Sequence, residues 1–164
     1  QKEPVVLENL IADLANLHGW NEKLKLNISK LPILPLDPYQ VKFLFTNLIQ
    51  NAISFNKEKT DLEVTITEIP ASLFRENVLE IEGKNFTAIA VSDNGAGVDP
   101  IHHRKIFELF QKIEEAENTD PKRKGMGLSF SKRIMLNHNG WILAHSNSPQ
   151  GLTIVLFFPN NGKL

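Results

Sequence analysis

Two asparagines, Asn47 and Asn51, lie four positions apart in a segment whose apolar residues have helical spacing. On a helix, positions i and i+4 lie on the same side, one turn apart, so both side-chain amides would face the same space. A neutral amide oxygen is a suitable hard ligand for Mg²⁺, which usually keeps several waters and shares phosphate oxygens. The pair alone is more typical of a solvated helix face.

Two glycine-containing segments add to this polar pair. Asp93-Asn94-Gly95-Ala96-Gly97 directly follows an apolar run that is typical of a strand, and Gly125-Met126-Gly127-Leu128 opens a segment with helical spacing. Glycines at a helix N-terminus leave backbone N–H groups exposed to a phosphate. The first segment by itself also reads as a turn. The sequence contains no Gly-Lys-Ser/Thr, which excludes a P-loop nucleotide site.

Together with a fourth segment, these features form an ordered set. Asn47-Leu48-Ile49-Gln50-Asn51-Ala52, Asp93-Asn94-Gly95-Ala96-Gly97, Ile106-Phe107-Glu108-Leu109-Phe110 and Gly125-Met126-Gly127-Leu128 follow one another along the chain. In this order they resemble the N box, first glycine box, F box and second glycine box of the ATP-binding domain of sensor histidine kinases. That family is part of a wider group with DNA gyrase, Hsp90 and MutL, and the resemblance covers residues 33 to 158.

The resemblance implies ATP and Mg²⁺ as cofactors and assigns roles to particular residues. Asn51 matches the Mg²⁺ ligand, and Asn47 matches a residue near the phosphates where related ATPases carry a catalytic glutamate; we predict both as catalytic. Asp93 matches the carboxylate that accepts the exocyclic amine of adenine. The other nucleotide-binding residues predicted on this basis are Phe55, Gly95, Gly97, Val98, Phe110, Lys122, Lys124, Gly125, Met126, Gly127, Leu128 and Thr153.

The polar stretch from Gln111 to Lys124 has no periodicity and corresponds in the resemblance to the loop that closes over ATP. Its cations could meet a triphosphate when such a loop closes. Two residues depart from the family pattern. Arg123 stands where the second glycine box usually has its first glycine, and Ser54 stands where many of these kinases have a lysine.

Hydrophobic periodicity predicts an α/β fold, a two-layer sandwich with helices on one face of a mixed, mostly antiparallel sheet of about five strands. Helices are expected over residues 5–17, 38–55, 100–110 and 125–137. At the start of the second, Asp37 is expected as the N-cap, Pro38 as the first helical residue, and Gln40 as the residue that completes a capping box. Strands are expected over 23–29, 62–69, 86–91, 141–146 and 152–158, the last two paired as a hairpin, with a short edge strand within 31–36. Residues 70–84 read as a hairpin insertion that contains an extra strand near Val78 to Ile81.

Composition limits the function classes. The chain has 164 residues, no cysteine and a formal net charge of −1, which provides no electrostatic basis for binding nucleic acid. No stretch is long and apolar enough to predict a membrane span. We interpret the chain as an excised part of a longer protein, with residues 1–20 as the end of a preceding dimerisation or linker region and residues 21–160 as the catalytic domain.

The five histidines do not show the phosphoacceptor pattern, in which Glu or Asp follows the histidine and proline comes a few residues later. We therefore expect this domain to transfer the γ-phosphoryl of ATP to a histidine on a separate dimerisation domain of the same protein, and a response regulator receiver domain to be the onward partner. We also expect a monomeric fragment from a homodimeric cytoplasmic, bacterial protein, with any membrane anchor outside this chain and no direct membrane contact by this domain. Two alternatives stay open: a degenerate noncatalytic nucleotide-binding or interaction module, and a serine kinase of the anti-sigma-factor type.

Overall fold

A five-stranded sheet forms one layer of the molecule. The computed structural model describes residues 1–56, 58–74, 85–108 and 127–160. The sheet order is β2 (Lys25–Ile28), β4 (Glu63–Ile69), β5 (Phe86–Asp93), β7 (Leu152–Pro159) and β6 (Trp141–Ser146). β2 pairs with β4 in parallel, and the other three pairings are antiparallel. The predicted mixed sheet is confirmed.

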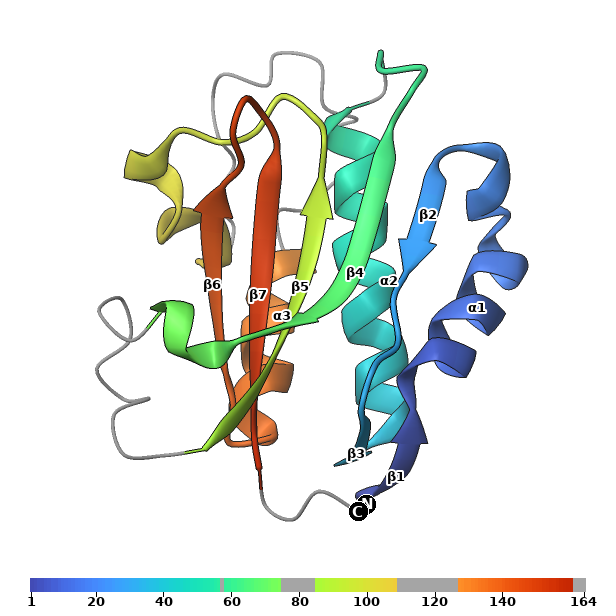
Figure 1. Cartoon of the computed structure of the whole chain (residues 1–164), viewed down its shortest axis with the longest axis vertical. Helices are drawn as coiled ribbons and strands as arrows, with labels where there is room; N and C mark the ends of the chain where they lie inside the picture. Colours follow the sequence, from blue (N-terminus) through green and yellow to red (C-terminus); the bar gives the residue numbers. More distant parts are fainter. Residues whose placement is uncertain (57, 75–84, 109–126, 161–164) are drawn as a thin grey trace.

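Helices form the second layer. Figure 1 shows α2 (Pro38–Phe55) and α3 (Gly127–Asn137) lying across one face of the sheet. The helix α1 (Leu7–His18) packs beside α2, and β1 (Glu3–Val6) pairs with β3 (Ile33–Leu36) in a separate small sheet. Short 3₁₀ turns are η1 (Trp20–Glu22), η2 (Ala71–Phe74), η4 (Pro100–His102) and η5 (Lys105–Phe107).

The main hydrophobic core lies between these two layers. Along α2 the buried positions recur every three or four residues, which places them on the face turned to the sheet. The largest fully buried side chains include Trp20, Phe45, Phe158, Ile89 and Leu156. Residues 1–20, which the sequence assigns to a preceding region, contribute Leu7 and Ile11 to the same core.

A smaller apolar cluster lies on the opposite face of the sheet. Ala88, Val155 and Phe157 are buried there, and Phe74 of η2 meets Phe157 edge-on with ring centroids 6.0 Å apart. The connection between β4 and β5 therefore begins by covering this face. The extra strand predicted near Val78 to Ile81 lies outside the described residues.

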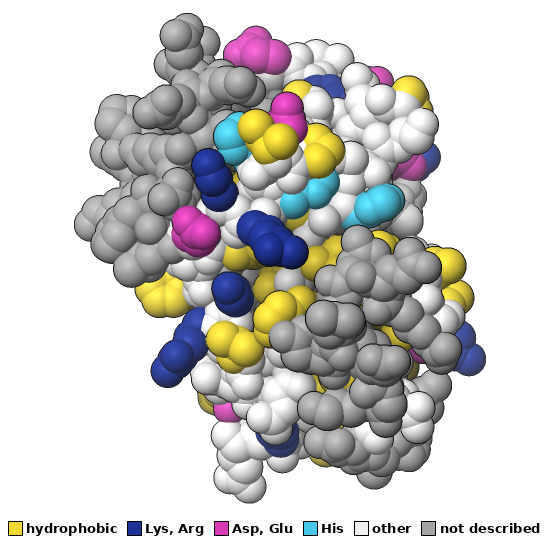
Figure 2. Space-filling model, turned by 90° about the vertical axis from the view of Figure 1, so that its left-hand side faces the viewer, with side chains coloured by type: hydrophobic (Ala, Val, Ile, Leu, Met, Phe, Trp, Pro, Cys, Tyr) yellow, Lys and Arg dark blue, Asp and Glu magenta, His cyan; other side chains and the backbone are white. Residues whose placement is uncertain are grey.

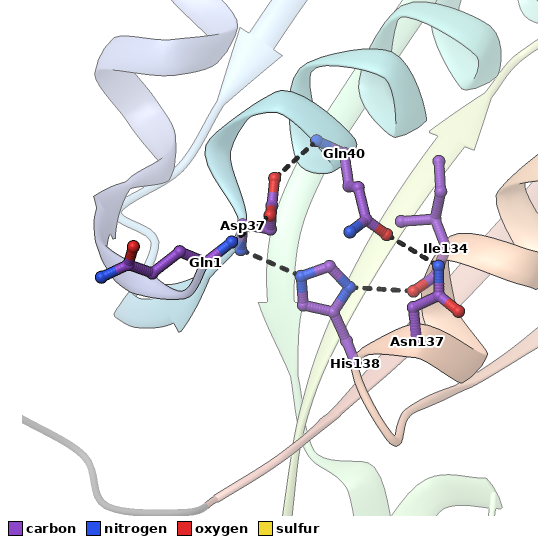
Figure 3. Close-up of polar contacts among 6 residues, drawn as sticks. All are labelled: Gln1, Asp37, Gln40, Ile134, Asn137 and His138. Atoms are coloured by element: carbon purple, nitrogen blue, oxygen red, sulfur yellow. Dashed lines mark hydrogen bonds and ion pairs between the residues drawn. The ribbon is translucent and has the colours of Figure 1, made fainter.

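The start of α2 is joined to the end of α3 (Figure 3). Asp37 caps α2, because its side chain accepts a hydrogen bond from the backbone N–H of Gln40 at 3.2 Å. The backbone N–H of Asp37 donates to Nε2 of His138 at 3.0 Å, and Nδ1 of His138 lies 2.8 Å from the carbonyl oxygen of Ile134. Because Nε2 accepts, Nδ1 carries the proton and donates to Ile134. This bridge joins the start of the helix that carries the asparagines to the end of the helix that begins at Gly127.

The predicted capping box is therefore only half formed. In a capping box the residue at the third helical position accepts the N–H of the cap. Here His138 takes that donor, and Oε1 of Gln40 instead accepts a hydrogen bond from Asn137 at 2.9 Å. A residue about a hundred positions away in the sequence has replaced the local partner.

Two other element boundaries were predicted wrongly. Val5 lies in β1 and not in α1, because its backbone pairs with Leu34. Residues 100–107 form the two 3₁₀ turns η4 and η5 where one helix over 100–110 was expected. After α3, Asn139 has a φ of 56°, the left-handed conformation in which many helices end.

Figure 2 shows Lys and Arg side chains next to hydrophobic ones on one side of the molecule. Exposed cations occur at Arg104 and Lys105 near the exposed Ile101, and at Lys132 and Arg133 near Leu136. Since the formal net charge of the chain is −1, these cations are a local feature of the surface. In the part of the chain that the structure describes, no helix is both long enough and apolar enough to cross a membrane.

Candidate nucleotide site

The two asparagines of α2 lie against the first residue of α3. Nδ2 of Asn47 donates to the carbonyl oxygen of Gly127 at 3.3 Å, and a Cβ on Gly127 would lie 3.3 Å from Nδ2 of Asn51. Ser131 donates to the same carbonyl at 3.1 Å. Residues that are 80 positions apart in the sequence therefore form one polar surface at the margin of the core. The structure brings together the N box and the described part of the second glycine box.

Asp93 ends the central strand β5. Its Oδ1 accepts hydrogen bonds from the backbone N–H of Gly95 at 2.8 Å and of Leu152 at 3.3 Å. Burial raises the pKa of this carboxyl above its ordinary value, although both N–H donors act in the opposite direction. Among the residues that the structure describes, Oδ2 has no hydrogen-bond partner. One carboxylate oxygen is thus held in place, and the other is available to a ligand.

Asn56, which follows the last residue of α2, fastens that helix to the first glycine box. Its Oδ1 accepts from the backbone N–H of Ala96 at 2.9 Å, and its Nδ2 donates to the carbonyl oxygen of Ala52 at 2.7 Å. A Cβ on Gly95 would lie 2.1 Å from Oδ1 of Asn56, so the loop approaches this closely only because residue 95 is glycine. Asn56 is not among the residues predicted from the sequence, because its role rests on a contact with a backbone group 40 positions away.

A second polar network, also missed from the sequence apart from Thr153, lies behind Asp93. The hydroxyl of Thr153 donates to Oδ1 of Asn147 at 2.5 Å and lies 2.7 Å from the hydroxyl of Ser92. Nδ2 of Asn147 donates to the backbone carbonyl oxygen of Asp93 at 2.9 Å. Within the described residues Thr153 makes no direct hydrogen bond to the carboxylate of Asp93, and it reaches Asp93 through Asn147 and the backbone carbonyl.

The remaining described candidates lie around this site. Phe55, at the end of α2, is 50% exposed, so it is not a core residue. Val98 and Leu128 are half-buried against the main core, and the carbonyl oxygen of Val98 lies 3.1 Å from Nε2 of His103. Phe107 of the F box is buried in the core. Gly97 lies in the loop after Asp93 with a φ of 77°.

Several predicted residues cannot be placed. Phe110, Lys122, Lys124, Gly125, Met126 and the whole segment Gln111 to Lys124 lie outside the described residues. Within the described residues there is no group of three or more His, Cys, Asp or Glu side chains that could hold a metal ion. A cation in this site would depend on the amide of Asn51 and on ligand oxygens.

The fold and this site define a class of nucleotide-binding domain. Residues 36–162 match the family described as histidine kinase-, DNA gyrase B-, and HSP90-like ATPase. The chain belongs to this ATPase family. The match spans α2, β5 and the loop after it, the start of α3 and the β6–β7 hairpin, which together carry every described candidate residue.

Two longer proteins are similar to this chain over most of its length. It is 28% identical over 162 residues to the sensor protein kinase WalK of Staphylococcus saprophyticus, an alignment that covers 96% of this chain and 25% of WalK. It is 29% identical over 148 residues to the phytochrome-like protein Cph1 of Synechocystis, covering 89% of this chain and 18% of Cph1. The chain therefore spans about a quarter or less of these relatives.

A solved structure supports the same fold. The catalytic domain of the histidine kinase ThkA superposes with a TM-score of 0.72, covers 97% of both chains and is 19% identical in sequence. The fold is that of a histidine kinase ATP-binding catalytic domain.

Proposed function

We propose that this domain binds Mg-ATP and donates its γ-phosphoryl group to a histidine on a separate dimerisation domain of the same protein. The observation that carries the proposal is the arrangement of the two halves of the site. The carboxylate of Asp93 has an available oxygen at one end, and Asn47 and Asn51 meet the N-terminus of α3 at the other. Asn56 connects these halves.

Asp93 is suited to select adenine. Its available oxygen can accept the exocyclic amine of adenine, whereas guanine presents a carbonyl at that position and would meet the carboxylate with like partial charge. Burial already disfavours the charged form of the carboxylate. A base that offers it a carbonyl in place of a donor would therefore add a further free-energy cost to binding. The carboxylate therefore supplies both affinity and base selectivity.

The other end of the site is suited to phosphates. α3 begins at Gly127 and is 11 residues long, so its first N–H groups and its dipole favour an anion. The amide oxygen of Asn51 is a ligand type that Mg²⁺ accepts, and the ion would supply charge neutralisation for the triphosphate. The residues present fit such an ion only as a partner of phosphate oxygens, in keeping with the absence of an acidic cluster from the described residues.

The side chain of Asn47 limits which reaction the site can catalyse. An amide is not a general base, so it cannot activate water for ATP hydrolysis. We infer that the domain transfers phosphoryl to a better nucleophile, with catalysis by positioning and electrostatic stabilisation. As the bond between the acceptor nitrogen and phosphorus forms, the bond from phosphorus to the bridging oxygen breaks and ADP leaves. The proton on the acceptor imidazole must go to a group other than Asn47 or Asn51.

The proposal also covers the setting of the domain. We propose residues 21–160 as the catalytic unit, a cytoplasmic location for this domain, the intact protein as a homodimer, and a response regulator receiver domain as the protein that takes the phosphoryl group onward. What supports this is the similarity to sensor protein kinases such as WalK. The isolated chain is expected to be a monomer, which light scattering after gel filtration measures.

Calorimetric titration with ATP, with and without Mg²⁺, tests the binding step. We expect binding of ATP that Mg²⁺ strengthens. No binding at millimolar Mg-ATP would contradict the proposal and favour a degenerate module. Binding followed by an acid-stable phosphoserine on a partner would favour the serine kinase alternative.

A further inference from the structure

Asn147 lies where β6 turns toward β7, behind the end of β5. Its backbone N–H donates to the carbonyl oxygen of Gly151 at 3.0 Å, which closes the turn. Its side chain reaches across to β5, where Nδ2 donates to the carbonyl oxygen of Asp93 at 2.9 Å. Its Oδ1 accepts the hydroxyl of Thr153 at 2.5 Å. One half-buried amide thus connects the turn, β7 and the residue that ends β5.

Gly151 makes this close approach possible. A Cβ on Gly151 would lie 2.0 Å from the carbonyl oxygen of Asp93 and 3.2 Å from Nδ2 of Asn147. Gly151 also has a φ of 109°, which L-residues rarely adopt. The turn is therefore shaped so that the backbone of Asp93 and the amide of Asn147 can meet.

A directed chain of hydrogen bonds supports the amide. The single proton of the Thr153 hydroxyl goes to Asn147, so the hydroxyl of Ser92 must donate to Oγ1 of Thr153. The chain runs from Ser92 through Thr153 and Asn147 to the carbonyl of Asp93. It begins and ends on neighbouring residues of β5, and successive bonds in such a chain strengthen one another.

The same turn also supplies a donor to the carboxylate of Asp93. Leu152, directly after Gly151, donates its N–H to Oδ1 at 3.3 Å. The carbonyl of Asp93 is held by Asn147, and its carboxylate is held from the same turn and from Gly95. The direction in which Oδ2 points therefore depends on how firmly the turn is fastened to β5.

We propose that Asn147 is a positioning residue for purine selection: it fastens the β6–β7 turn to Asp93 and thereby aims the available carboxylate oxygen at the adenine amine. This inference rests on the proposed function, since it assigns a role within the same ATP site. If Asn147 only stabilised the turn, its substitution would change the affinities for all nucleotides alike. If Asn147 positions Asp93, its substitution chiefly lowers the affinity for the nucleotide whose base donates to Asp93.

The test compares ATP with inosine triphosphate, which carries a carbonyl in place of the amine. Affinities for both are measured by calorimetry on the wild-type chain, Asn147→Ala and Asn147→Asp. Asn147→Asp keeps the shape and the acceptor for Thr153 but removes the donor to Asp93. Asn137→Ala is the matched control, because Asn137 is exposed and bonds to Gln40 at the other end of α3. Thermal unfolding without nucleotide shows that each variant is folded.

For Asn147→Ala we expect ATP affinity to fall about tenfold, the equivalent of one well-aligned hydrogen bond, and inosine triphosphate affinity to change less than about twofold. Asn147→Asp should lose the same selectivity, and it decides the question if the alanine variant does not fold. Asn137→Ala should keep the wild-type ratio. An equal loss for both nucleotides, or an unchanged ratio in both Asn147 variants, overturns the inference. A wild-type chain that binds neither nucleotide overturns the proposed function instead.

Discussion

Asn56 occupies the space that a side chain on Gly95 would need, with its Oδ1 only 2.1 Å from the position of a Cβ there. The same oxygen accepts the N–H of Ala96. The end of the helix that carries the asparagines is thereby locked to the loop that follows Asp93. This fit of one side chain against one glycine adds a polar link between the two halves of the site to the packing of α2 on the sheet.

This relationship predicts a specific coupling. Gly95→Ala should lower the free energy of unfolding by about 1–3 kcal/mol, the usual cost of forcing atoms into a packed space. Asn56→Ala should cost about 1 kcal/mol through its lost hydrogen bonds. The double variant should cost less than the sum, because removing the amide makes room for the new methyl group. Urea unfolding of the four proteins measures this, and strictly additive costs would contradict it.

Asp93→Asn should separate binding from stability. Asparagine replaces the carboxylate with a neutral amide, so the available oxygen is either uncharged or exchanged for an NH₂ group. ATP affinity should therefore fall about tenfold or more, as when a hydrogen bond to a charged group is lost. Burial raises the pKa of Asp93, so its charge disfavours the folded state above the folded pKa, and this cost is absent below the ordinary value of 3.8. Asparagine at neutral pH removes that cost and can still accept from Gly95 and Leu152.

The unfolding temperature of Asp93→Asn without nucleotide should therefore equal or exceed that of the wild type. Calorimetry of unfolding and of ATP binding on the same preparations gives both quantities. A variant that loses stability in step with affinity would show that the carboxylate serves the fold and not the ligand.

His138 predicts an acid-dependent loss of stability. Burial lowers its pKa below the ordinary 6.5, with nearby Lys2 also lowering it and Asp37 and the Ile134 carbonyl acting in the opposite direction. The unfolded chain therefore binds the proton more readily than the folded chain. The stabilising bridge is intact above pH about 6.5, and stability falls as the pH drops below that value toward the folded pKa.

His138→Gln serves as the comparison for this prediction. It should be less stable at neutral pH, because the bridge from Asp37 to Ile134 is altered, and its stability should decline less between pH 7.5 and 5.5. Urea unfolding at several pH values measures both slopes. Parallel slopes for the two proteins would assign the pH dependence to other groups.

Asn51→Ala should remove the dependence of nucleotide binding on Mg²⁺. If the amide of Asn51 shares the ion with phosphate oxygens, the ratio of ATP affinities with Mg²⁺ and with EDTA should fall toward one in the variant. Phe43→Leu, at an exposed position of the same helix, should keep the wild-type ratio. An unchanged ratio in Asn51→Ala would place the ion on other ligands.

The sequence predicted most of the fold because periodicity and capping are local signals. The burial spacing of α2, its cap at Asp37 and the hairpin between β6 and β7 were all visible along the chain. Two of the errors arose where a distant residue replaced a local partner. His138 accepts the N–H of Asp37, which Gln40 was expected to accept. Val5 lies in a strand and not in the expected helix, because its backbone pairs with Leu34.

The same difference between local signals and distant contacts explains which site residues could be predicted from the sequence. Asn47, Asn51 and Asp93 stand in segments whose spacing is itself informative. Asn56 and Asn147 act through single contacts with backbone groups that are 40 and 54 positions away. Nothing in their immediate neighbours marks them, so only the folded arrangement shows what they hold.

The most direct test of the account is transfer of phosphate itself. The chain is mixed with the histidine-bearing dimerisation domain of its intact protein and with Mg-ATP labelled on the γ-phosphate, and label on the partner is followed before and after acid. We predict acid-labile label on the partner's histidine, reduced strongly in Asp93→Asn and Asn51→Ala. ATP binding without any transfer, or acid-stable label on the partner, would contradict the account.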